Sequence, residues 1–266
     1  MKNFFLLFIA SVFILTSCGT NDDFLEQSNE VGNNSTESRS DCRYPILDNS
    51  EYDLLGKGHN ELLEQAMNIL ALQNESISIS SIQNVFRHLD IPGVQFTNSE
   101  IEGRLEDYYF EIINKTLNEP PSKLLPFIND LDYIFNSTSN FNELSNLLNH
   151  KIEEIGNDIN INNDLRIAAK GFFTVAKYSA EFWLPESAGG SGIGYTYLLN
   201  TGHINSEDDV IQALSIAKAD AIGAAGGMLE WCGAAILGGP VGVAGFVGGA
   251  IFGAAFASAV TGMGGG

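Results

Sequence analysis

The chain has 266 residues, of which 44% are hydrophobic, so it can form a substantial core and general disorder is excluded. Its 33 acidic residues outnumber 13 basic residues, which gives a formal net charge of -20, and no stretch concentrates Lys or Arg. This charge balance argues against nucleic acid as a partner and against simple electrostatic attachment to anionic lipid.

The N-terminal 18 residues have the order of a bacterial export signal that ends in a lipidation site. Lys2 is followed by an apolar run, Phe4–Leu15, and this run leads into the sequence Leu-Thr-Ser-Cys at Leu15–Cys18. The run fits the apolar part of a secretory signal and is too short for an ordinary membrane span. The alternative is an export signal that is cleaved without lipidation, in which Cys18 is incidental.

In this order of features the chain resembles the bacterial lipoproteins that are cut by the lipoprotein signal peptidase. The resemblance implies removal of residues 1–17, acylation of Cys18 with palmitate or a similar chain, and attachment to a lipid bilayer. Asp22 and Asp23 resemble the acidic cluster behind the lipidated cysteine in surface-exposed lipoproteins of the Bacteroidetes type. We therefore expect the protein in the cell envelope, lipid-anchored at the outer membrane on its periplasmic or its surface face.

Residues 18–51 are predicted to form a flexible tether, because they are rich in polar residues and glycine and carry few large apolar groups. Apart from Cys18 the cysteines are Cys42 and Cys232, with no C-x-x-C motif or Cys/His cluster near either. We therefore expect no metal and no cofactor. A Cys42–Cys232 disulfide is permitted outside the cytoplasm, but one mobile and one packed thiol is the simpler interpretation.

Residues 52–205 are predicted to form an all-α, multi-helix domain. Apolar side chains recur there at spacings of three and four, and the helical pieces are separated by Asn, Ser, Gly and Pro. Helices are expected over 82–89 and 101–113, among others. The first helix is expected to bury one face, which consists of Leu62, Leu63, Ala66, Met67 and Leu70.

Several helix boundaries follow from capping residues, prolines and glycines. Asn140 with Glu143 opens one helix. A helix is expected over Asp164–Trp183, with Phe172, Val175 and Phe182 in the core. Pro126 is expected to bend or interrupt another helix. The glycine-rich stretch from Pro185 to His203 is expected to be a loop.

Catalytic motifs are largely missing from the sequence. H-E-x-x-H, G-x-S-x-G and P-loop patterns do not occur. Ser215 and Lys218 match the S-x-x-K motif of acyl-transfer enzymes, but the K-T-G that follows in those enzymes is absent, which favours a solvent-facing helix turn. We therefore expect that the protein is not an enzyme.

His59 and Asn60 are the candidate polar site. They follow Gly56 and Gly58 at the start of an amphipathic pattern, where they could present a general base or a polar recognition corner. The favoured interpretation is structural: the glycines turn the chain, Asn60 caps the helix, and His59 packs or hydrogen-bonds locally. The stretch Tyr52–Asn60 resembles one in secreted proteins of Bacteroidetes and related bacteria, which implies no activity.

Residues 206–266 are predicted to form a glycine- and alanine-rich helical hairpin, and no charged residue occurs from Trp231 to Gly266. Its second arm has small residues at every fourth position: Gly245, Gly249, Gly253 and Ala257. Such a glycine zipper lets another helix backbone approach closely, and the glycines require tight packing or lipid to stay helical. The run resembles glycine-zipper segments of envelope proteins and of some pore-forming bacteriocins.

Three settings are open for this hairpin: packing against its own domain, insertion into a membrane, and self-association through the zipper. Asp220 and Glu230 would each cost a few kcal/mol in hydrocarbon, so packing against its own domain is favoured. The leading functional hypothesis is a non-catalytic envelope protein that binds an unidentified partner or associates through helical surfaces. The alternative is a membrane-active, bacteriocin-like factor whose hairpin enters target bilayers.

Overall fold

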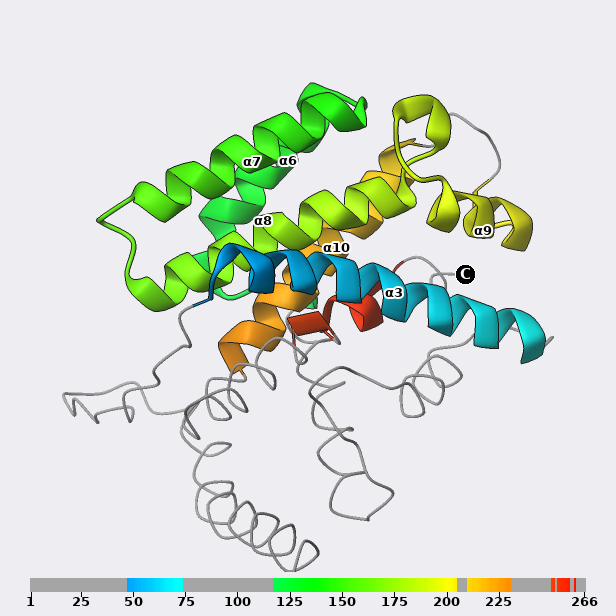
Figure 1. The fold of residues 1–266 in the computed structure, drawn as a ribbon, viewed down its shortest axis with the longest axis horizontal. Coiled ribbons are helices and arrows are strands. Elements are labelled where there is room, and N and C mark those ends of the chain that lie inside the picture. Colours follow the sequence, from blue (N-terminus) through cyan, green and yellow to red (C-terminus); the bar gives the residue numbers. More distant parts are fainter. Residues whose placement is uncertain are drawn as a thin grey trace, which may run out of the picture. The chain divides into compact units, whose positions relative to one another are not determined.

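The computed structural model describes residues 47–73, 117–204, 210–230, 250–251, 253–258 and 261 (Figure 1). All of them belong to one compact unit, residues 42–266. The predicted signal with Cys18, most of the tether, the helices expected over 82–89 and 101–113, Cys232, and the zipper residues Gly245 and Gly249 lie outside the described residues.

The described residues form helices and no strands, so the predicted all-α, multi-helix fold is confirmed. The α-helices are α3 (Asn49–Gln73), α6 (Leu125–Ser137), α7 (Phe141–Asn157), α8 (Asn163–Trp183), α9 (Ile193–Thr201) and α10 (Val210–Glu230). Two 3-10 turns, η2 (Ser122–Leu124) and η3 (Glu186–Ala188), precede α6 and α9. A further helical stretch, residues 250–251 and 253–258, is called the C-terminal arm below.

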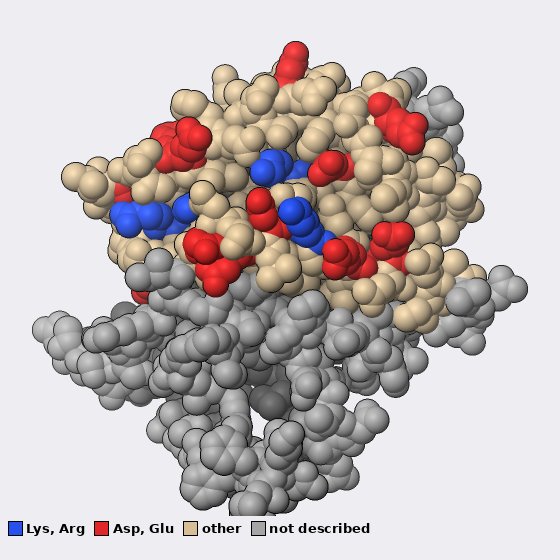
Figure 2. Space-filling view, viewed as in Figure 1, with Lys and Arg blue, Asp and Glu red and all other residues tan. Residues whose placement is uncertain are grey.

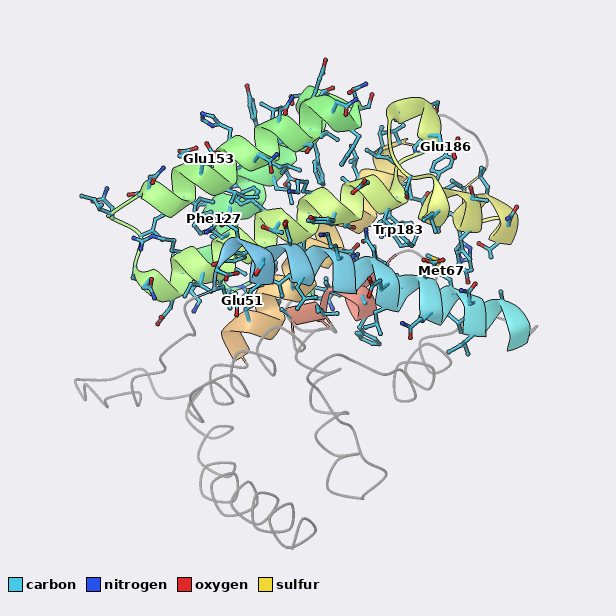
Figure 3. All side chains as sticks on the ribbon, in the orientation of Figure 1. Glu51, Met67, Phe127, Glu153, Trp183 and Glu186 are labelled. Carbon is cyan, nitrogen blue, oxygen red and sulfur yellow. The ribbon has the colours of Figure 1, made fainter. Side chains whose placement is uncertain are left out.

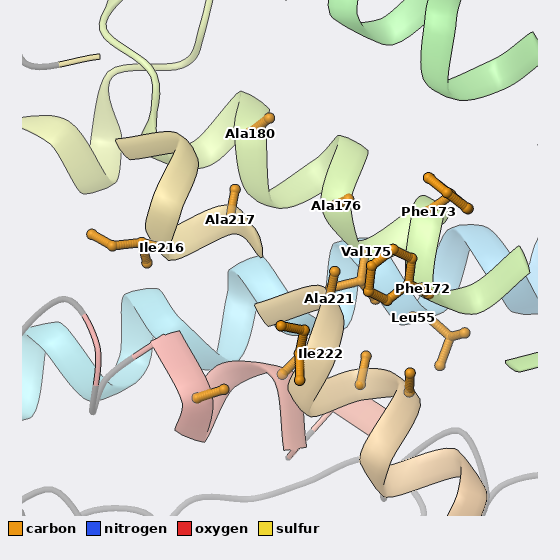
Figure 4. Packing of buried hydrophobic residues seen from close by; sticks show 14 of the residues in the cluster. Leu55, Phe172, Phe173, Val175, Ala176, Ala180, Ile216, Ala217, Ala221 and Ile222 are labelled. Atoms are coloured by element: carbon orange, nitrogen blue, oxygen red, sulfur yellow. The ribbon is translucent and has the colours of Figure 1, made fainter. Parts of the chain in front are cut away.

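Helix α8 is the element on which α3, α7, α9 and α10 pack (Figure 1). Every residue from Gly171 to Ala176 is buried, so this part of α8 has neighbours on all sides. Phe172 and Phe173 meet edge to face with ring centroids 5.0 Å apart. Small residues such as Ala176 and Ala217 are among the buried residues of α8 and α10 (Figure 4).

One helix start agrees with its predicted capping residue, and a second agrees with its predicted position. The Asn140 side chain accepts hydrogen bonds from the backbone N–H groups of Asn142 and Glu143, at 3.0 and 3.3 Å, and thereby caps α7. The Glu143 carboxylate accepts from the Thr138 hydroxyl at 2.6 Å. Helix α8 is capped by Asn162 and ends at Trp183, close to its predicted bounds.

Two boundary predictions were wrong. Pro126 lies in the first turn of α6, where its missing N–H costs nothing, so it starts the helix and does not bend it. The predicted loop over Pro185–His203 contains α9. Two of its glycines flank that helix: Gly192 precedes it and Gly202 ends it, with left-handed φ values of 72° and 76°.

The glycines before His59 do not turn the chain, because α3 runs without a break through Gly56 and Gly58. A Cβ on Gly56 would lie 2.0 Å from the Tyr178 ring, and one on Gly58 would lie 2.6 Å from Ile251 Cδ1. Both glycines therefore allow other segments to approach α3. Asn60 lies inside the helix, so its predicted role as a cap was wrong.

The C-terminal arm packs on α10 through glycine backbone. A Cβ on Gly223 would lie 2.4 Å from the Gly253 carbonyl oxygen, and a Cβ on Gly253 would lie 2.5 Å from the Gly223 oxygen. The same position on Gly223 is 2.6 Å from Ala257 Cβ. The described zipper residues, Gly253 and Ala257, are thus used inside the fold. Within the described ranges, no helix is long and apolar enough to cross a membrane.

The close contact between Gly223 and Gly253 predicts that even one added methyl group at Gly223 destabilises the fold. Gly223→Ala should lower the free energy of unfolding by about 1–3 kcal/mol, because the nearest atoms are backbone and cannot rotate away. Gly156→Ala in α7 is the matched control, since no atom lies within 4 Å of its added Cβ, and it should stabilise by about 0.5–1 kcal/mol. Urea unfolding followed by circular dichroism measures both. Equal effects of the two substitutions would contradict the close contact.

Candidate functional site

Five buried polar side chains come together where four segments of the chain meet. They are His59 from α3, Ser179 and Trp183 from α8, Asp220 from α10, and Ser258 from the C-terminal arm. Each has 0% of its surface exposed. We call these five residues the buried polar cluster; Trp183 is labelled in Figure 3.

Asp220 is the centre of the cluster. Its Oδ2 accepts a hydrogen bond from the Ser179 hydroxyl and another from Trp183 Nε1 at 3.1 Å. His59 Nε2 lies 3.1 Å from the same oxygen. Trp183 Nε1 also donates to Ser258 Oγ at 3.0 Å. One carboxylate oxygen therefore connects α10 to α3 and α8, and the indole connects α8 to the arm.

Asn60 fixes the orientation of the histidine ring. Its Nδ2 donates to the Tyr178 carbonyl oxygen at 3.1 Å, so its Oδ1 is the atom that faces His59 Nδ1 at 2.8 Å. Because Oδ1 can only accept, Nδ1 carries a hydrogen. The candidate site predicted at His59 and Asn60 is thus a real polar contact, but it points into the protein core.

The groups around the Asp220 carboxylate compensate its burial only in part. The contact between His59 Nε2 and Asp220 Oδ2 has the distance of an ion pair but lacks hydrogen-bond alignment, and Asp220 Oδ1 has no hydrogen-bond partner. A buried polar atom without a partner costs free energy. The cluster therefore leaves two buried polar atoms, Asp220 Oδ1 and His59 Nε2, without a hydrogen bond.

The order of the groups does not suit nucleophilic catalysis. In a Ser-His-Asp arrangement the imidazole lies between the hydroxyl and the carboxylate and takes the hydroxyl proton. Here the carboxylate of Asp220 lies between Ser179 and His59, and all three are sealed from solvent. Within the part of the chain that the structure describes, no three His, Cys, Asp or Glu side chains gather in a way that could hold a metal ion.

A partly exposed hydrogen bond between Tyr178 and Asp53 lies beside the buried polar cluster. The Tyr178 hydroxyl donates to Asp53 at 2.9 Å and joins α8 to α3. Burial, followed by this hydrogen bond, raises the pKa of Tyr178 from 10.0 to about 12. Because the folded value is the higher one, the contact adds stability that is complete below pH 10 and is lost as the pH rises through about 12.

Two surface lysines pair with carboxylates of another helix; Figure 2 shows Lys and Arg next to Asp and Glu on one face of the described part. Lys218 of α10 lies 2.8 Å from Asp132 of α6, and Lys151 of α7 lies 2.8 Å from Asp130 of α6. Lys218 is thus engaged by a carboxylate, and its predicted S-x-x-K partner, Ser215, is exposed. The described geometry gives this motif no acyl-transfer arrangement.

Comparison with protein-family models, with curated proteins and with solved structures finds no match to this chain. The interpretation of the cluster therefore rests on its own geometry. Ser179, Trp183 and Ser258 were not predicted as site residues. The available signal was Asp220, a charge within an alanine- and glycine-rich helix, because such a buried charge needs a partner and His59 was a candidate.

The pair of His59 and Asp220 predicts a measurable coupling. Asp220→Ala or His59→Ala alone should cost about 3–5 kcal/mol, because each removes one partner of a buried pair and leaves the other only partly compensated. The double variant should cost less than the sum, with a coupling of about 0.5–3 kcal/mol. Lys218→Ala, which breaks a surface pair on the same helix, should cost at most about 1 kcal/mol. Additive losses in chemical unfolding would mean that the two side chains do not interact.

Proposed function

We propose that this protein is a lipid-anchored, non-catalytic protein of the bacterial cell envelope that acts by association through its helical surfaces. The observation that carries the proposal is the burial of the polar cluster. Among the described residues, the group that most resembles a reactive site has every member at 0% exposure, with a carboxylate between the hydroxyl and the imidazole. Such a group joins helices and is not open to a substrate.

The anchor in this proposal is Cys18, which lies in the sequence order of a lipoprotein signal. The outer surfaces of α6 and α7 are candidates for association. Tyr133 on α6 is 78% exposed and Leu147 on α7 is 43% exposed. Aromatic residues are enriched at protein interfaces, because they give a large contact area at little cost in side-chain entropy.

The anchor is tested in bacteria that express the full chain. Cys18→Ala should abolish incorporation of labelled palmitate and block processing of residues 1–17, whereas Ser17→Ala should keep both. Labelling that survives Cys18→Ala would reject the anchor.

Association is tested with a photo-reactive amino acid at Tyr133. We expect a discrete cross-linked product from this position, and none from the exposed control position Glu186 on η3, which lies outside α6 and α7. Cross-linking that is absent from Tyr133, or that is equal at both positions, would remove the support for a surface at α6.

A second candidate function, a membrane-active factor, is favoured by α10. Every residue from Ala219 to Met228 is buried, although a helix usually exposes one face. Apart from Asp220, this stretch is apolar on all sides, which suits either a protein core or a bilayer. The discriminating measurement is dye release from protein-free vesicles by the purified chain without residues 1–18. Release by the folded protein favours this candidate, and its absence favours association.

A further inference from the structure

The bonds of the buried polar cluster run between two groups of helices. Asp220 and Ser258 belong to α10 and the C-terminal arm, which we call the C-terminal helices. Their cluster partners, His59, Ser179 and Trp183, belong to α3 and α8, which we call the sheath helices. Separating the two groups would therefore break the contacts of Asp220 and Ser258 within the cluster.

Close apolar contacts also join the two groups. A Cβ on Gly58 of α3 would lie 2.6 Å from Ile251 of the arm, and one on Gly171 of α8 would lie 2.1 Å from Met228 of α10. Apolar contacts of this kind can be exchanged for contacts with lipid at little cost, because lipid chains are as apolar as the side chains. The polar contacts of the cluster cannot be exchanged for contacts with lipid, because hydrocarbon offers no partner to a carboxylate or a hydroxyl.

We propose that the buried polar cluster is an autoinhibitory contact that retains α10 and the C-terminal arm between the sheath helices and so keeps them out of lipid bilayers. Asp220 opposes the entry of α10 into a membrane in two ways. Its carboxylate binds groups on α3 and α8 in the folded protein, and it opposes entry of α10 into hydrocarbon. Weakening the cluster should therefore release the C-terminal helices to a membrane. This inference rests on the second candidate function, the membrane-active factor, and does not depend on the lipid anchor.

The test compares variants of the full chain, each with Cys18→Ser to prevent acylation. The probe is dye release from vesicles of phosphatidylcholine, a lipid without net charge that does not repel an acidic protein. Ser179→Ala removes one hydrogen bond to Asp220, and Asp220→Asn removes the charge itself. Each should raise the rate of dye release at least about tenfold, as expected when loss of a buried interaction increases the population of an open state.

Leu148→Ala is the matched control. This residue is fully buried in α7, which packs on α8 and α6, so its truncation destabilises the domain without removing a cluster side chain. Release that stays near the level of the parent protein in this control supports the proposal. Equal release by Leu148→Ala and Ser179→Ala, at similar losses of melting temperature, would assign the leakage to general unfolding and overturn it.

A second measurement remains informative if a variant folds poorly. The chain has 2 tryptophans, so Trp231→Phe makes Trp183 the sole source of indole fluorescence. On addition of vesicles, the Trp183 emission should stay unchanged in the parent protein and should shift in Ser179→Ala as its bonds to Asp220 and Ser258 break. Full dye release by the parent protein with unchanged Trp183 emission would also overturn the proposal, because the cluster would then not restrain the active segment.

Discussion

The carboxylate of Asp220 has no contact with solvent, and the arrangement of the helices around it depends on how its charge is compensated. A buried carboxylate is tolerated when hydrogen bonds and a counter-charge replace its hydration. Here the replacements come from α3 and α8, and none of those in the cluster comes from α10 itself. The position of α10 is therefore tied to the relative placement of two other helices, and the Trp183 indole extends this dependence to the C-terminal arm.

Such short polar side chains can meet only if the helix backbones lie close together, and glycine provides this proximity. Gly56 accommodates the ring of Tyr178, whose carbonyl oxygen holds Asn60, and Asn60 in turn orients His59. Gly223 and Gly253 bring the arm against α10. A methyl group at one of these glycines would displace a neighbouring segment and move cluster groups apart. Close packing and polar pairing are thus two parts of one arrangement in this fold.

Features that depend on local spacing could be predicted from the sequence, and features that depend on tertiary contact could not. The buried face of α3 and the capping of α7 by Asn140 follow from periodicity and side-chain chemistry alone. The role of a glycine depends on what approaches it, so Gly56 was misread as a turn and Gly194, which lies inside α9, as part of a loop. His59 was identified as a candidate, but its partner lies on a distant helix, and sequence spacing contains no information on that contact.

The carboxylate of Asp220 would have opposite consequences for α10 in the protein interior and in a bilayer. Between α3 and α8 its charge is matched by donors and an imidazole, whereas in hydrocarbon it would be unmatched. The apolar residues around it contribute similarly in both places, because Ala, Gly, Ile and Met are as compatible with lipid as with a protein core. Under the proposal made above, the free-energy difference between a folded and a membrane-inserted α10 would therefore come mainly from its charged groups, which are Asp220 with its cluster partners and Lys218 with Asp132.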